Sequence, residues 1–148
     1  MKNKIKNLTT NEIQDAIIEE FSFFEDWTQK YEYIIECGKE LGGLDEKYKI
    51  EENKVTGCQS HVWLHASLSN GLIHYGIDSE ALIVKGLAAL LLRVFNDRTA
   101  DEILATQPTF IEGIGMKAHL SPTRSNGLAS MVKQIKNYAV AFKSKSLA

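Results

Sequence analysis

The spacing of apolar residues along the chain changes twice, which predicts helices on either side of a short run of strands. Up to about Leu41, apolar residues recur at helical spacing. Over residues 49–77 they tend to alternate with polar residues, and from about Ile83 helical spacing returns. This order predicts one α+β domain over residues 1–148. Residues 1–8, which are rich in lysine and asparagine, are expected to be disordered.

Residues that commonly cap helices stand before each helical pattern. Thr9-x-x-Glu12 and Thr99-x-x-Glu102 both have the form of a capping box. The third predicted helix contains Ile83, Leu87, Leu90, Leu91 and Val94. It carries few charges for its length, which predicts a buried position at the centre of the fold. The last helix is expected to run to about Phe142. The predicted caps of the five helices are Thr9, Asp26, Asp78 or Ser79, Thr99 and Ser121, the last followed by Pro122.

The central region predicts a small antiparallel sheet of about three strands. From His61 to Leu68 the alternation is clean, and Asn70-Gly71 is a strong hairpin signal. The return strand follows over Leu72 to Ile77, and a weaker pattern over Lys49 to Val55 is expected to supply the third strand. The side chains expected to face the core from the first hairpin strand are Val62, Leu64, Ala66 and Leu68.

Composition and charge narrow the classes of function. The chain carries 17 basic and 19 acidic side chains, a formal net charge of −2, so nucleic acid and anionic membranes are not expected partners. Two cysteines are too few for a disulfide framework or a typical structural zinc site. The N-terminal residues lack the apolar run of a secretory signal, and Leu87–Leu92 is too short to span a bilayer. A reducing cytoplasm is therefore the expected compartment.

Cys58 is the residue best placed for chemistry. It follows Gly57 at a predicted turn, directly before the clean strand pattern, where a thiol is presented rather than packed. Backbone amides around such a turn favour a thiolate, which is the reactive form of cysteine. The alternative is that Cys58 is a small buried apolar residue. Cys37, inside the second predicted helix, is expected to be packed and inert.

His61 and Arg124 are weaker candidates. His61 lies three residues beyond Cys58 and could serve as the base of a thiol enzyme, although strand histidines more often face solvent. Arg124 is predicted in the first turn of the last helix, where the helix dipole disfavours a cation. That placement indicates pairing with an anion or a partner, or simply a solvated side chain. Asp78 could be no more than a helix cap.

Four segments, taken together, resemble the SufE-like family of cysteine desulfuration proteins, to which SufE and CsdE belong. They occur in the family's order and lie between about Glu25 and Tyr138. The Gly57-Cys58-Gln59-Ser60 segment followed by Val62-Trp63 is the most specific of them. The four segments are Trp27–Gly38, Val55–Trp63, Asp78–Leu87 and His119–Leu128.

The resemblance implies a fold and a function. The fold is a three-stranded antiparallel sheet packed against helices, which related cluster scaffold proteins share. The implied function is that of a sulfur acceptor. Cys58 would take sulfur from a SufS-like or CsdA-like cysteine desulfurase, stimulate that enzyme, and pass the sulfur to a SufB-containing scaffold complex for iron–sulfur cluster assembly. The pyridoxal phosphate belongs to the desulfurase, so the chain itself is expected to be an accessory protein without cofactor or metal.

The resemblance also assigns roles to residues around Cys58. Gly57, Gln59 and Ser60 would shape the presenting loop. Asp78 would lie at a turn packed near that loop, and Arg124 on the surface that faces the partner. Cys37 departs from the family pattern, in which an aliphatic residue is expected.

Several alternatives remain open at this point. One is a related carrier that serves another desulfurase branch. A second is a partner-independent Cys/His thiol enzyme with His61 as base. A cluster scaffold and a purely structural domain are the others, although two cysteines argue against a scaffold. The sequence leaves both a monomer and a homodimer open.

Overall fold

The computed structural model describes residues 8–147, so the disorder expected for residues 1–7 lies outside the described residues. Leu8, the first described residue, packs against the hydrophobic core. Within residues 8–147 no helix is both long and apolar enough to cross a bilayer. The elements are α2 (Thr10–Ser22), α3 (Trp27–Glu40), the 3-10 helices η1 (Glu46–Tyr48) and η2 (Glu51–Asn53), β1 (Val62–Ser69), β2 (Leu72–Ser79), α4 (Leu82–Phe95), α5 (Ala100–Ala105), α6 (Phe110–Gly113), the 3-10 helix η3 (Met116–His119) and α7 (Pro122–Leu147).

Four of the five predicted helix starts are confirmed. Thr9 and Thr99 both cap their helices in full capping boxes. Asp26 accepts a hydrogen bond from a backbone amide in the first turn of α3. Ser121 Oγ accepts one from the amide of Arg124 at the start of α7. These caps satisfy N–H groups that a helix otherwise leaves unpaired at its N-terminus.

The predicted start of α4 is wrong. Neither Asp78 nor Ser79 is its cap; Ala81 occupies that position and makes no side-chain hydrogen bond. Ser79 Oγ instead accepts a hydrogen bond from the Ala81 amide, ahead of the helix. Asp78 belongs to the end of β2, where its carboxylate has other partners.

The α+β class is confirmed, but the sheet within the described residues has two strands, β1 and β2, rather than three. The strands pair antiparallel with Leu64 opposite Ile77. Val62, Leu64 and Ala66 face the core as predicted. Leu68, near the hairpin turn, is 40% exposed and does not face the core as predicted, although its pairing partner Ile73 is fully buried.

The segment expected to form the third strand, Lys49–Val55, does not extend along the sheet. Here the chain forms η2, directly after η1, and Lys54 makes an isolated bridge to Trp63. The Tyr48 ring of η1 stacks on His65 of β1, with ring centroids 3.9 Å apart, so η1 and the residues that follow it cover the outward face of the hairpin. Acidic residues and asparagine are poorly represented in strands, which accounts for the turns.

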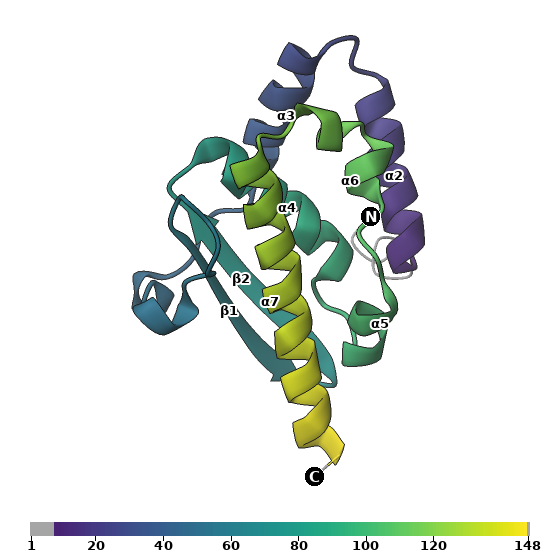
Figure 1. Ribbon diagram of the computed structural model, residues 1–148. Helices are drawn as coiled ribbons and strands as arrows, with labels where there is room; N and C mark the ends of the chain where they lie inside the picture. The colour runs from purple at the N-terminus through teal and green to yellow at the C-terminus, as the bar shows by residue number, and fades with distance from the viewer. Residues whose placement is uncertain (1–7, 148) are drawn as a thin grey trace.

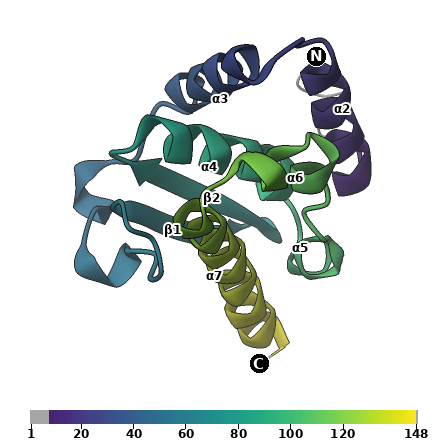
Figure 2. The same ribbon diagram turned by 45° about the horizontal axis from the view of Figure 1, so that its top comes forward.

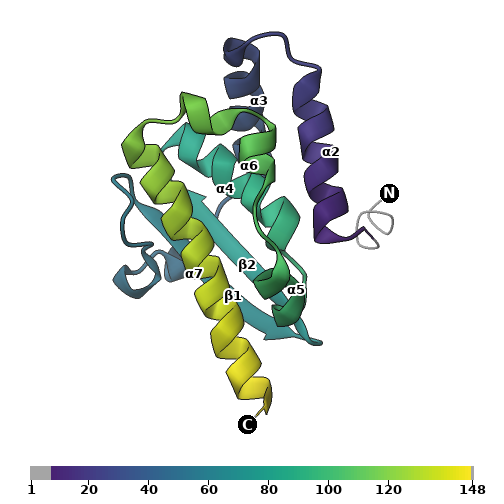
Figure 3. The ribbon, with the colours of Figure 1, turned by 45° about the vertical axis from the view of Figure 1, so that its right-hand side comes forward.

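α4 lies at the centre of the molecule, as its low charge predicted. Figure 2 shows it between α3 and the hairpin. α7 runs diagonally across the hairpin on the face that α4 also covers (Figures 1 and 3). Tyr75 Oη donates a 2.6 Å hydrogen bond to the Ile135 carbonyl, which joins β2 to the middle of α7. This packing brings the first turns of α7 beside the loop that precedes β1.

Candidate functional site

Cys58 lies in a short loop whose two ends are held together. The Val55 amide donates a 2.8 Å hydrogen bond to the Val62 carbonyl, which closes the loop at the start of β1. Gly57 has φ of +90°, and a Cβ atom there would lie 2.5 Å from Ser130 Oγ of α7. Glycine is therefore favoured at this position, because other residues rarely adopt this backbone conformation and a Cβ atom would also displace the Ser130 hydroxyl.

The Cys58 thiol points at α7. Its Sγ donates a hydrogen bond to the Gly127 carbonyl oxygen at 3.5 Å. A Cβ atom at Gly127 would lie only 3.3 Å from that sulfur, so the glycine also makes room for the thiol. Cys58 is half-buried, and burial raises the pKa of its thiol. The group is therefore protonated at neutral pH and is an available hydrogen-bond donor.

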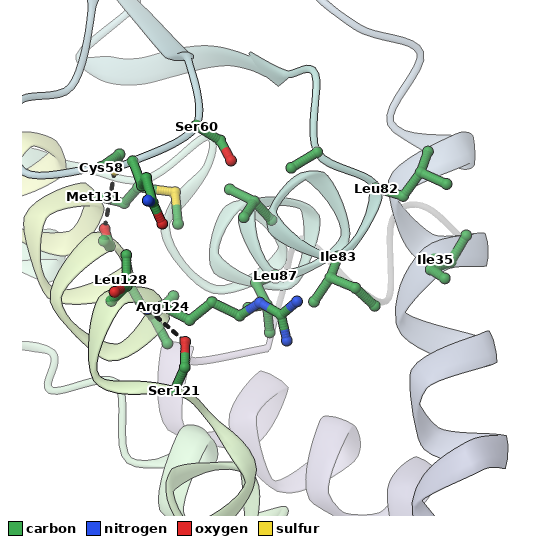
Figure 4. Close-up of a pocket in the computed structure, with 15 residues that line it drawn as sticks. Ile35, Cys58, Ser60, Leu82, Ile83, Leu87, Ser121, Arg124, Leu128 and Met131 are labelled. Atoms are coloured by element: carbon green, nitrogen blue, oxygen red, sulfur yellow. Dashed lines mark hydrogen bonds between the residues drawn. The ribbon is translucent and has the colours of Figure 1, made fainter.

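A pocket of about 500 Å³ opens beside Cys58 between α3, α4 and α7. Its floor is apolar, whereas Ser60 and Arg124 contribute polar groups. Figure 4 shows the Arg124 side chain extending from α7 toward Ile83 and Leu87. Leu82, at the start of α4, is 59% exposed although it lines the pocket. The apolar floor is formed by Ile35, Ile83, Val84, Leu87, Leu128 and Met131.

Comparison with known proteins identifies the family. Residues 15–139 match the sequence model of SufE, described as an Fe-S metabolism associated domain. The chain belongs to the SufE family. An uncharacterized SufE-like protein of Rhizobium meliloti is 42% identical over 130 residues, which are 84% of this chain and 93% of that protein. A SufE-like protein of Synechocystis is 40% identical over 126 residues, covering 85% of this chain and 79% of the relative.

A solved structure supports the fold. The solution structure of a hypothetical protein from Thermus thermophilus aligns with a TM-score of 0.72, covering 87% of this chain and 94% of the other. Its sequence identity is 19%, so the likeness concerns the fold. The resemblance inferred from the four segments is confirmed, and membership of the SufE family places the chain in Fe-S metabolism.

The structure brings together most of the residues that the SufE resemblance pointed to. Gln59, Ser60 and Arg124 line the same pocket as Cys58, and Gly57 shapes the loop. Among the side chains that the structure describes, none forms a salt bridge with the Arg124 guanidinium, which leaves it available at the pocket.

Three of the other candidates lie apart from the pocket. His61 Nδ1 is 3.3 Å from Glu80 Oε1, and His61 has no recorded contact with the Cys58 thiol within the described chain. Cys37 lines a different pocket, beside Tyr33. Asp78 does not line the Cys58 pocket either. The two thiols therefore do not converge, and no described side chain is placed as a general base for Cys58.

Asp78 is a buried residue near the end of β2, and several partners hold its carboxylate. Its carboxylate pairs with Lys49 Nζ at 3.1 Å and Lys85 Nζ at 3.2 Å. It also accepts hydrogen bonds from the amides of Leu44, at 3.1 Å, and Ser79, at 2.8 Å. Burial alone would raise the pKa of Asp78, but these hydrogen bonds and ammonium groups lower it below its ordinary value of 3.8. Asp78 thus joins the segment after α3 to the turn between β2 and α4, whose residues line the pocket.

Replacing Asp78 by asparagine is expected to destabilise the fold by about 1–3 kcal/mol at pH 7, because the partly buried ammonium groups of Lys49 and Lys85 lose this counter-charge, although Lys49 still pairs with Glu46. A lowered carboxyl pKa contributes stability that is present above the unfolded-state pKa and is lost as pH falls through the folded-state pKa. The stability difference between wild type and Asp78→Asn should therefore shrink below about pH 4. Urea unfolding at a series of pH values measures it; a difference independent of pH would contradict this role.

Sequence reasoning did not select Gly127 as a site residue, although it stands inside one of the matching segments. A glycine inside a helix costs about 1 kcal/mol relative to alanine, so its presence in α7 signals a close approach. Within the described residues, no group of three or more histidine, cysteine or acidic side chains converges as a metal site would require. The site therefore offers one thiol, an apolar floor and one cation.

Proposed function

We propose that this chain is a sulfur acceptor that carries sulfur as a persulfide on Cys58. The observation that carries the proposal is the position of Cys58. Its thiol lies in a closed loop at the edge of an open pocket, with no general base of its own among the described residues. Membership of the SufE family supports the assignment. The donor is a cysteine desulfurase, SufS-like or CsdA-like, and the receiver is a SufB-containing scaffold complex.

The transfer is an exchange at sulfur. The Cys58 thiolate attacks the outer sulfur of the desulfurase persulfide; a new S–S bond forms on Cys58, and the desulfurase thiolate leaves with the electron pair of the broken bond. The Cys58 proton is lost to solvent or to the donor, and no external oxidant or reductant is needed. The pyridoxal phosphate stays with the desulfurase, and its chemistry is complete before Cys58 acts.

The environment of Cys58 favours a carrier over a free-standing thiol enzyme. Burial raises the thiol pKa, and His61 is paired with Glu80 rather than with Cys58. A raised pKa suppresses reaction with stray electrophiles, since only the thiolate is nucleophilic. Deprotonation then depends on the docked partner. The reducing cytoplasm, where free thiols persist, suits this chemistry.

The pocket mouth supplies contacts for the donor. Leu82 is an exposed apolar side chain, and Arg124 is an exposed cation on the opposite side of the pocket. An apolar contact flanked by a charge is typical of a specific protein interface. The two residues therefore form the surface on which we expect the desulfurase to dock.

Titration of a cysteine desulfurase with the wild-type chain tests the proposal. With free cysteine in excess, the rate of alanine formation should rise with added chain and then saturate, because Cys58 removes the sulfur that otherwise blocks turnover. The same chain without desulfurase should not turn over small electrophiles. A flat titration with desulfurases of both branches would count against the acceptor role.

A further inference from the structure

The Cys58 loop is tethered to α7 by a single hydrogen bond. Within residues 8–147, the bond from Cys58 Sγ to the Gly127 carbonyl is the one recorded between residues 56–60 and α7. Gly57 only approaches Ser130 closely. The hydrogen bond that attaches the loop to α7 therefore depends on the hydrogen of the thiol.

Loading Cys58 with sulfur removes that tether. In a persulfide the Cys58 Sγ is bonded to carbon and to the outer sulfur, so it has no hydrogen left to donate. Its lone pairs then face the oxygen of the Gly127 carbonyl, which is also only an acceptor. Two facing acceptors in a half-buried site repel each other, although the carbonyl keeps the hydrogen bond that it accepts within α7.

The limited space between Cys58 and α7 also favours release of the loop from α7. Cys58 Sγ is only 3.5 Å from the Gly127 oxygen, so an outer sulfur directed at α7 would overlap that oxygen. The free volume lies on the other side, in the pocket that Arg124 lines. An outer sulfur must therefore point into the pocket, where the guanidinium is the available cation for a persulfide anion.

We infer that Gly127 is a positioning residue that distinguishes empty from sulfur-loaded Cys58, an inference that rests on the proposed function. Its carbonyl holds the free thiol against α7 and releases the loop once Sγ carries a second sulfur. The empty and loaded chains then differ in the 56–60 loop. The desulfurase that donates sulfur therefore binds a chain whose loop is tethered to α7. The scaffold complex that receives sulfur binds a chain whose loop is released.

Methyl methanethiosulfonate tests this inference without any partner protein. The Cys58 thiolate attacks its sulfenyl sulfur, forms Cys58–S–S–CH3 and displaces methanesulfinate, so Sγ gains a second sulfur and has no hydrogen. A Cys37→Ser background confines the reaction to Cys58. The readout is amide hydrogen exchange in peptides covering residues 55–63, compared between the untreated and the capped chain.

Capping is expected to accelerate exchange in residues 56–60 by about fivefold, the effect of losing one hydrogen bond. Cys58→Ala, which removes the donor without adding bulk, should show a similar acceleration. Exchange in the centre of α4 should stay unchanged in both, which separates loop release from loss of stability. Unchanged loop exchange in either chain would overturn the inference, whereas failure of desulfurase stimulation would overturn the proposed function instead.

Discussion

Replacing Cys58 by serine is expected to abolish the stimulation of a cysteine desulfurase, lowering sulfur transfer by about a hundredfold or more. A serine hydroxyl stays protonated at neutral pH and is a poor nucleophile toward sulfur, so no S–S bond forms. The fold should be retained, because the side chain is small and half-buried. The rate of alanine formation at saturating chain measures the effect.

Cys37→Ser is the matched control for that substitution. Cys37 lies in a separate pocket beside Tyr33, and burial raises its thiol pKa as it does for Cys58. The two cysteines thus share burial and differ in position. Stimulation should survive Cys37→Ser. Equal losses in the two variants would show that Cys58 has no special role and that a structural effect is being measured.

Gly86→Ala is expected to be the most damaging conservative change to the fold, destabilising it by about 3 kcal/mol or more. A Cβ atom at Gly86 would lie 2.1 Å from the Ile34 carbonyl oxygen and 2.5 Å from Ile34 Cγ2. The first contact is with backbone, which cannot rotate away. α3 would have to move off α4, and α4 carries part of the pocket wall. Thermal or urea unfolding gives the loss directly.

Gly38→Ala provides the comparison. Its Cβ would lie 2.8 Å from the Gly86 amide nitrogen, a less severe overlap at the same helix crossing. In an unobstructed helix, both alanine substitutions would stabilise by about 1 kcal/mol. We therefore expect both to destabilise, Gly86→Ala more than Gly38→Ala. A stabilising effect of either would mean that α3 and α4 are less closely packed at this crossing than these distances indicate.

Local signals were sufficient to predict most elements of the fold. Thr9, Asp26, Thr99 and Ser121 cap the helices that they were expected to cap, because capping depends on residues within one turn. The hairpin followed from Asn70-Gly71 and the alternation before it. The apolar, weakly charged sequence of α4 correctly indicated a central helix.

The errors arose where distant partners decide the structure. Asp78 looked like a helix cap but is held by Lys49, Lys85 and the Leu44 amide, up to 34 residues away in sequence. The Lys49–Val55 segment alternates weakly, yet it folds as turns over the outward face of the hairpin, where Lys49 reaches Asp78. No local pattern reveals such pairings.

The same distinction between local and distant contacts explains which parts of the candidate site the sequence indicated and which it did not. Cys58 and its neighbours stood out because a glycine-flanked thiol before a strand is a local feature. The acceptor of the thiol, the Gly127 carbonyl, lies 69 residues further along the chain. Its contact with Cys58 depends on how α7 crosses the hairpin. A glycine inside the last helix was the available signal of that approach.

Intact-mass spectrometry of the chain after incubation with a cysteine desulfurase and free cysteine tests the central claim most directly. The sample is quenched without reductant, and wild type, Cys58→Ser and Cys37→Ser are treated side by side. We expect wild type and Cys37→Ser to gain the mass of sulfur, mapped by peptide analysis to Cys58, and Cys58→Ser to gain none. Absence of any gain on wild type, or a gain that persists in Cys58→Ser, would contradict the assignment of Cys58 as the sulfur-carrying residue.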